Sequence, residues 1–260
     1  MQATRSAEMD RKAEIGAAFG AAAGHYDSSA AVQRTVATHL AEMASREKLP
    51  QGAQILEIGC GTGLLTQEIR AHWPEATLIA TDIAPDMLAI ADRRGAANQL
   101  LAMDGEAPVF EGRWFDLILS SLAFQWFDDM GAALARLHGL LRPGASLYFA
   151  TMGAESFATW RQAHAHCGLS AGIPDYPTLA ALQAMLAPYT DAFACDEHHP
   201  LPERGGAALV RHFRGIGAQL PRDGYRPLGP AAMRRVIGAF DEAGGETSYH
   251  VLYGRITHAG

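Results

Sequence analysis

The chain has 260 residues, of which 48% are hydrophobic and 19% charged, a length and balance typical of one large or two small globular domains. Its 28 acidic residues outnumber its 21 basic ones and give a net charge of −7, so a protein built to bind nucleic acid or an anionic membrane is not expected. The three cysteines are widely spaced and include no CxxC pair, which favours a reducing, cytoplasmic compartment. No stretch approaches the roughly 18 consecutive apolar residues of a membrane-spanning helix, and the first residues lack the apolar segment of a signal peptide.

The first two thirds of the chain alternate between strand and helix patterns. Apolar positions at helical spacing predict a leading helix over 28–45, after a small-residue segment over 19–27. Short apolar runs that predict strands follow at 54–58, 77–81, 100–103, 115–120 and 145–150. Helical patterns separate them over 64–69, 86–93 and 130–141. This alternation predicts a parallel sheet with helices on both faces.

The last third adds further helices and two strands. Helices are expected over 155–166, 178–186, 207–220 and 231–241, and strands over 193–199 and 249–256. Because the final strand does not alternate polar and apolar residues as a surface strand does, we expect it inside the sheet. The predicted organisation is a set of N-terminal lid helices over 1–46 and one domain over 47–260, with a helical insertion at about 203–245.

A glycine-rich turn follows the first predicted strand. Such a turn lets backbone N–H groups approach a ligand closely at a helix N-terminus. The dinucleotide fingerprint G-x-G-x-x-G fails here, because its third glycine would fall on Leu64. The glycines Gly59, Gly61 and Gly63, preceded by Glu57, instead resemble motif I of the class I S-adenosylmethionine-dependent methyltransferases. That resemblance implies an α/β, Rossmann-like fold with a seven-stranded, mostly parallel sheet.

Acidic residues after the next strands extend this resemblance. In the family, a carboxylate at the position of Asp82 holds the ribose hydroxyls of the cofactor, and one at the position of Asp104 accepts from the adenine amino group. The resemblance further implies that Gly105 offers its N–H to the adenine ring and that Ser120 lies near the methionine part. Taken singly, such carboxylates are more often turn formers. Glu57 ends an apolar strand, where a charge needs a partner such as the cofactor's ammonium group.

Two other patterns favour a structural interpretation. Cys60 lies in the glycine loop without a nearby histidine, so we interpret it as a small filler rather than a nucleophile. The cluster His164, His166 and Cys167 resembles a metal site, but residues two apart on a helix face different sides. No metal site is expected.

The N-terminal segment carries a more specific resemblance. Phe19, Ala22, Ala23 and Tyr26, followed by the pair at 33–34, are similar to the opening F-x-x-A-A-x-x-Y-(D/E)…Q-R of the BioC family, the malonyl-acyl carrier protein O-methyltransferases of biotin synthesis. Similar family motifs recur at 120–126, 155–160, 209–218 and 249–254. The chain is thereby identified as a candidate member over its whole length.

This resemblance implies an enzyme that uses S-adenosylmethionine to esterify the free carboxylate of malonyl-acyl carrier protein, or of malonyl-CoA, early in biotin biosynthesis. A carboxylate is already ionised at neutral pH and needs no general base. We expect hydrogen bonds from His25, Tyr26 and Gln125 to orient it, with Arg34 as a further candidate donor and Trp126 as an apolar wall. A strong ion pair would blunt the nucleophile.

Charge is segregated in the predicted insertion. Between 203 and 235 there are seven arginines and two acidic residues, for a local net charge of +5. Such a segment would attract an acidic carrier protein, with Arg211 and Arg214 as candidate contacts. The alternative is that the arginines pair with the acidic body of the protein.

Two other functions remain open at this point. A small-molecule carboxyl methyltransferase of the trans-aconitate type would share the core and the Gln125-Trp126 pair, but would not need the arginine-rich insertion. A non-catalytic S-adenosylmethionine-binding subunit would keep the loop motifs without turnover. The sequence does not indicate the oligomeric state or decide between carrier protein and coenzyme A.

Overall fold

A seven-stranded mixed sheet forms the centre of the computed structural model, which describes residues 2–216 and 225–260. The strands are β1 (Gln54–Ile58), β2 (Thr77–Asp82), β3 (Gln99–Ala102), β4 (Phe115–Ser121), β5 (Leu141–Met152), β6 (Thr190–Pro200) and β7 (Ser248–Thr257). Their order is β3-β2-β1-β4-β5-β7-β6. The first five strands are parallel to one another, whereas β7 pairs antiparallel with both β5 and β6. The expectation that the last strand lies inside the sheet is confirmed.

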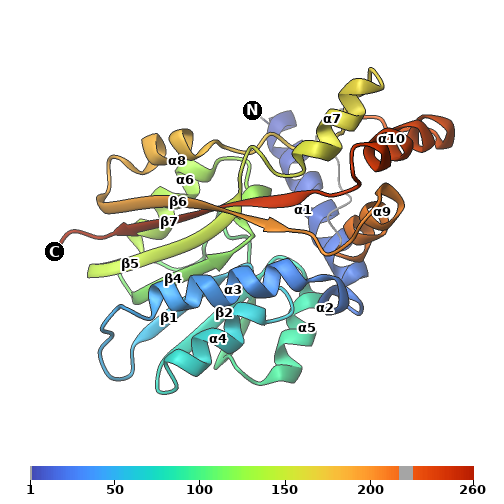
Figure 1. Cartoon of the computed structure of the whole chain (residues 1–260). Coiled ribbons are helices and arrows are strands. Elements are labelled where there is room, and N and C mark those ends of the chain that lie inside the picture. Colours follow the sequence, from blue (N-terminus) through green and yellow to red (C-terminus); the bar gives the residue numbers. More distant parts are fainter. Residues whose placement is uncertain (1, 217–224) are drawn as a thin grey trace.

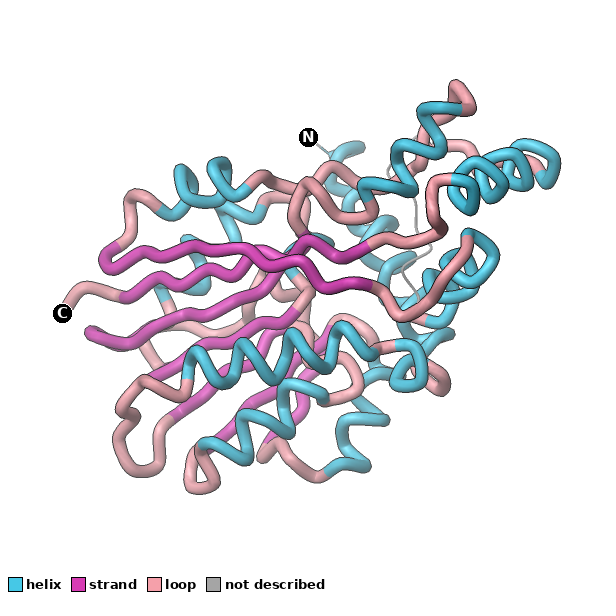
Figure 2. Tube along the Cα trace, viewed as in Figure 1, coloured by secondary structure: helices cyan, strands magenta, loops and turns pink. Residues whose placement is uncertain are grey.

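Helices cover both faces of this sheet (Figures 1 and 2). Alternate side chains of β1 show why: Ile55 packs in one core with α3 (Ala31–Ala44) and α4 (Leu64–His72), whereas Leu56 packs in another with α6 (Met130–Gly139) and α8 (Leu179–Leu186). Both strand residues are fully buried. A strand apolar on both faces is what a sheet enclosed between two helical layers requires.

The N-terminal segment is more helical than its pattern indicated. Helix α1 (Gln2–Ala22) precedes a short α2 (Tyr26–Ser29), and the non-helical residue Ala30 separates α2 from α3. The predicted helix over 28–45 therefore covers the end of α2 and all of α3. α1 has no continuous apolar stripe, so its periodicity gave no helical signal.

In the described part of the chain, four helices follow β5, and α5 (Pro85–Arg94) lies between β2 and β3. α7 (Ala158–His166) begins three residues later than predicted, because Phe157 adopts a left-handed φ of 57° just before it. Between β6 and β7, the described residues form α9 (Gly206–Gly215) and α10 (Pro230–Glu242). Together with α7, which packs against α10, they lie beyond one end of the sheet (Figure 1).

Some of the predicted features lie outside the described residues: part of the helix over 207–220, the motif residues Gly217 and Ala218, and Arg222. Within the described part of the chain, no helix combines the length and apolar character needed to cross a membrane.

Candidate functional site

Two adjoining cavities lie where the parallel strands end, the edge at which open α/β sheets bind ligands. The first, which we call the loop cavity, has a volume of about 110 Å³ and is lined by the glycine loop after β1 and by residues following β2, β3 and β4. The second, the aromatic cavity, has a volume of about 390 Å³ and extends toward α7, α9 and α10. Five residues line both cavities: Phe19, Tyr26, Gln33, Leu122 and Trp126. We call this set the shared wall.

The glycine loop requires glycine for two different reasons. At Gly59, with φ at +69°, a Cβ atom would lie 2.4 Å from the Cβ of Ala123. At Gly61, with φ at +54°, the space beside the Cα is open, and the backbone N–H donates to Asp82 Oδ2 over 2.8 Å. Gly63 has a φ of 90° at the start of α4. Only glycine adopts this run of left-handed conformations at little cost, so the backbone itself lines the loop cavity.

Glu57 places a buried carboxylate in the loop cavity. Its side chain lines the cavity, the residue is 1% exposed, and Oε2 has no hydrogen-bond partner within the described part of the chain. Burial raises the pKa of Glu57 to about 8, opposed by the Thr66 hydroxyl and assisted by the smaller effect of the negative charge of Asp82. A buried carboxylate with an unpaired oxygen is costly, so this position suits a positively charged ligand group such as an ammonium.

Asp82 is held rigidly at the end of β2. Its Oδ2 accepts from Gly61 N and its Oδ1 from Ala84 N, each over 2.8 Å. Burial raises the pKa of Asp82, and the backbone N–H donors oppose that shift. An ionised carboxylate has about four acceptor positions, so two remain for ligand hydroxyls. The structure thus brings Glu57, Asp82, Gly59 and Gly61 together around one cavity, whereas Gly63 lies behind its lining at the start of α4.

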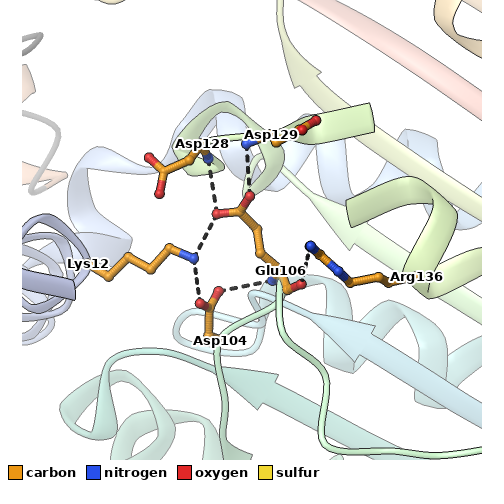
Figure 3. A network of polar contacts seen from close by, with 6 residues as sticks. All are labelled: Lys12, Asp104, Glu106, Asp128, Asp129 and Arg136. Carbon is orange, nitrogen blue, oxygen red and sulfur yellow. Dashed lines mark hydrogen bonds and ion pairs between the residues drawn. The ribbon is translucent and has the colours of Figure 1, made fainter. Parts of the chain in front are cut away.

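Asp104 belongs to an ionic network that the sequence patterns did not reveal (Figure 3). Lys12 Nζ lies 2.5 Å from Asp104 Oδ2 and 2.8 Å from Glu106 Oε2. Burial alone would lower the pKa of Lys12, but the bonds and charges of the two carboxylates outweigh it and raise that pKa. A single lysine in a helix without an apolar stripe carries no motif, so no local signal could have identified it.

Glu106 anchors this network to the segment before α6. Its two carboxylate oxygens accept from the backbone N–H groups of Asp128, over 3.0 Å, and Asp129, over 2.9 Å, and Arg136 donates to its carbonyl oxygen over 2.8 Å (Figure 3). The residue is 5% exposed. Lys12 therefore attaches α1 to a carboxylate that the body of the protein already fixes in place.

Gly105 and Ser120 differ in their relation to the loop cavity. Gly105 lines it, and a Cβ there would lie 2.5 Å from Ile58 Cγ2, so a larger residue would not fit. Ser120 does not line either cavity: it is fully buried and its hydroxyl donates to the Ile58 carbonyl over 2.9 Å. Because side chains alternate along a strand, the next residue, Ser121, is the one that lines the cavity.

Three of the residues expected at the substrate line the aromatic cavity. Tyr26 and Trp126 belong to the shared wall, and Trp126 packs edge-on against Phe19 with ring centroids 5.2 Å apart. Gln125 also lines this cavity, and its Nε2 donates to the Leu122 carbonyl over 2.5 Å. The aromatic rings give this wall an apolar surface.

His25 and Arg34 lie elsewhere. Both are exposed, and neither lines a cavity. His25 comes just before α2, where its carbonyl oxygen accepts from Ser28. Successive residues of a helix point about 100° apart, which is why Gln33 is buried in the shared wall while Arg34 faces outward. The expectation that His25 and Arg34 contact the substrate is not supported by this geometry.

The predicted insertion contributes to the aromatic cavity through α9. Arg214 is the one arginine or lysine among the described residues that line it, and Arg211 is exposed on the same helix. Arg204 forms an exposed ion pair with Glu246 over 2.7 Å, and Arg235 donates to the Cys167 carbonyl over 3.0 Å. Some arginines of the predicted insertion therefore have partners within the protein.

Cys60 and the two histidines of α7 are the residues that the sequence patterns led us to interpret as structural. Cys60 is 5% exposed, and burial raises the pKa of its thiol, which disfavours the nucleophilic thiolate. On α7, His164 is 1% exposed with Nδ1 at 2.9 Å from the Trp160 carbonyl oxygen, whereas His166 is exposed. The two histidines face different sides of the helix.

Comparison with known proteins supplies independent information. A family described as a methyltransferase domain matches residues 56–149. The biotin biosynthesis bifunctional protein BioCD of Bordetella avium is 44% identical over 91% of this chain and 50% of that protein, so the chain spans half the length of this relative. The malonyl-acyl carrier protein O-methyltransferase of Magnetococcus marinus is 38% identical over 97% of this chain and 95% of that protein. Among solved structures, the YcgJ protein of Bacillus subtilis matches in fold, with a TM-score of 0.60, 16% identity, and coverage of 85% of this chain and 99% of that one.

Proposed function

The chain belongs to the malonyl-acyl carrier protein O-methyltransferase family, and from that membership we propose that it methylates the free carboxylate of malonyl-acyl carrier protein with S-adenosylmethionine. The product is a methyl ester, formed early in biotin biosynthesis. The observation that carries this proposal is the pair of cavities with one wall in common: a loop cavity with an unpaired buried carboxylate beside an aromatic cavity open to an arginine-bearing helix.

The loop cavity fits the cofactor. Glu57, buried and with Oε2 unpaired, suits the ammonium of the methionine part, and Asp82 would hold the ribose hydroxyls. Asp104 does not line this cavity, and its oxygens accept from Lys12 Nζ and from the Glu106 N–H, so its assignment to the adenine amino group rests on the family resemblance alone. When bound, S-adenosylmethionine supplies a methyl group on a positively charged sulfur that a carboxylate can accept without a base.

The protein's own task is then to hold the carboxylate and to exclude water. Burial, with smaller contributions from the charges of Asp82 and Asp27, raises the pKa of Tyr26 far above neutrality, so its hydroxyl remains a donor. A neutral donor orients a carboxylate without removing its nucleophilicity as a strong ion pair would. Phe19 and Trp126 exclude water from the shared wall.

We assign the carrier protein to the exposed arginines of α9. Arg214 lines the aromatic cavity and Arg211 is exposed on the same helix, so a carrier bound there could direct its thioester arm into the cavity. Complementary charge mainly accelerates encounter and selects the partner. A cytoplasmic location is consistent with the three cysteines, none of which forms a disulfide.

Intact mass spectrometry tests the proposal. Malonyl-acyl carrier protein is incubated with the enzyme and S-adenosylmethionine, with acetyl-acyl carrier protein as a control that lacks the free carboxylate. We expect one methyl group to be added to the malonyl form alone. Methylation of malonyl-CoA but not of the carrier-bound substrate would contradict the proposal that acyl carrier protein is the partner. Absence of methylation on both malonyl thioesters, with cofactor binding confirmed by calorimetry, would overturn the substrate and favour a small carboxylic acid.

A further inference from the structure

A chain of four hydrogen-bonded side chains runs from α9 to the shared wall. Glu203 Oε1 lies 3.2 Å from His212 Nδ1, and His212 Nε2 lies 2.9 Å from the Tyr249 hydroxyl. Gln33 Nε2 donates to that same hydroxyl over 3.3 Å. His212, Tyr249 and Gln33 are 4%, 3% and 8% exposed. Three elements far apart in the sequence, α3, α9 and β7, thus meet at the Tyr249 hydroxyl.

The direction of each hydrogen bond in this chain is determined by its first member. Burial lowers the pKa of His212 despite the opposing charge of Glu203, so the ring is neutral. A carboxylate can only accept, and His212 Nδ1–H therefore donates to Glu203. His212 Nε2 is then an acceptor for the Tyr249 hydroxyl, whose oxygen accepts from Gln33 Nε2.

This direction leaves the amide oxygen of Gln33 as the free end of the chain. Gln33 Oε1 is buried and has no hydrogen-bond partner among the residues that the structure describes, although Gln33 lines both cavities. An unpaired buried acceptor costs about 1 to 3 kcal/mol. A ligand that brings a hydrogen-bond donor or a positive charge to the shared wall would satisfy this amide oxygen. An anionic carboxylate would be repelled by it.

We infer that Gln33 is a cofactor-binding residue whose amide oxygen, oriented by Tyr249, His212 and Glu203, faces the positively charged end of the cofactor at the boundary between the two cavities. Tyr249, His212 and Glu203 are positioning residues in this arrangement. The inference rests on the proposed cofactor. It adds a contact to those of Glu57, Asp82 and Asp104, and it lies on the wall that the methyl group must cross.

The test is cofactor affinity rather than turnover. Calorimetry compares the binding of S-adenosylmethionine and S-adenosylhomocysteine, which carries the ammonium but no charged sulfur, to the wild type and to Gln33→Leu. We expect the dissociation constant for S-adenosylmethionine to rise about tenfold, the size of one hydrogen bond to a charged group. An equal rise for S-adenosylhomocysteine assigns the contact to the ammonium, and a rise confined to S-adenosylmethionine assigns it to the sulfonium.

Companion variants separate this role from a structural one. Gln33→Glu keeps an acceptor at the cavity but loses the donor to Tyr249, so its affinity for S-adenosylmethionine should lie between those of the wild type and Gln33→Leu. Tyr249→Phe should weaken binding in the same direction as Gln33→Leu. Tyr148→Phe is the matched control, because Tyr148 is also buried and donates to a carboxylate, Glu47, over 2.7 Å, but lines neither cavity. Its affinity should equal that of the wild type.

The possible failures are distinguishable. If the wild type binds neither cofactor form, the proposed function itself is wrong. Suppose that the wild type binds both cofactor forms and that a melting curve shows Gln33→Leu to be folded. If this variant then binds both forms as tightly as the wild type, the inference on Gln33 is wrong and the proposed function stands. If Gln33→Leu does not fold, the decision passes to Tyr249→Phe, and wild-type affinity in that variant would overturn the oriented-amide arrangement.

Discussion

Lys12 and Asp104 are 92 positions apart in the sequence, and their side chains meet over 2.5 Å, so that helix α1 is attached to the segment after β3. The same helix places Ile15 and Phe19 on the loop cavity. α1 is therefore a roof over the cavity, closed by the ion bridge from Lys12 to Asp104 and Glu106. We therefore expect a ligand in this cavity to leave more slowly while the ion bridge holds the roof in place.

Replacing Lys12 with methionine should loosen that roof. We expect S-adenosylhomocysteine to dissociate several times faster, because charge-assisted bonds to two partly buried carboxylates are lost. The wild-type rate should rise with salt, since exposed parts of the ion bridge are screened, whereas the variant's rate should not. Stopped-flow fluorescence measures both rates. Lys48→Met, at an exposed lysine, is the control, and equal rates in Lys12→Met and wild type would rule out the roof.

The pH dependence of the empty protein follows from Glu57. Burial raises the pKa of Glu57 from 4.5 to about 8, so the native state holds a proton that the unfolded state releases. The free energy of unfolding should therefore fall as the pH rises from about 4.5 to about 8. Chemical denaturation across this range measures it. Glu57→Gln, which cannot ionise, should remove this part of the slope, and an unchanged slope would show that Glu57 does not cause it.

The same group predicts a proton linkage for cofactor binding. An ammonium beside Glu57 favours its ionised form, so binding at pH 7 should release a proton and affinity should increase with pH up to about 8. Calorimetry in buffers of different ionisation enthalpy measures the proton release. In Glu57→Gln we expect affinity to be lower and proton release to disappear. Proton release of equal size in the variant would contradict the assignment.

Tyr26→Phe tests the donor at the shared wall. The ring remains and the hydroxyl is lost, so we expect kcat with malonyl-acyl carrier protein to fall roughly tenfold or more, because one hydrogen bond to a charged group is worth about 1.5 to 3 kcal/mol. Cofactor affinity should change little. Steady-state kinetics and calorimetry on the same preparation separate the two effects, and unchanged turnover would exclude the orienting role.

Much of the fold and half of the site could be predicted because their signals are local. The strands of the parallel sheet are short apolar runs, and Glu57, Gly59 and Asp82 lie at the ends of two of them. Those residues are close in space because parallel strands end at one edge of the sheet. A motif that is contiguous in sequence therefore specifies the loop cavity.

The remainder of the site could not be predicted because its members come from distant segments. Gln33 and Tyr249 are 216 positions apart and meet through tertiary packing, which no spacing reveals. The family resemblance identified the segment at 33–34 but not which of its two residues faces inward. Arg34 was therefore expected at the substrate, whereas its neighbour Gln33 is the residue of the pair that lines the cavities.

The arginines of α9 provide a test of the carrier protein as partner. Reversing the charge of Arg211 and Arg214 to glutamate should raise KM for malonyl-acyl carrier protein about tenfold at low salt and less at high salt, because the attraction of an acidic partner is screened. KM for malonyl-CoA should change much less, since only the carrier protein presents an extended acidic surface. Arg204→Glu, at an exposed arginine paired with Glu246, controls for the change in net charge. If Arg204→Glu raises KM for the carrier substrate as much as a single reversal at Arg211, general charge repulsion and not docking on α9 explains the effect.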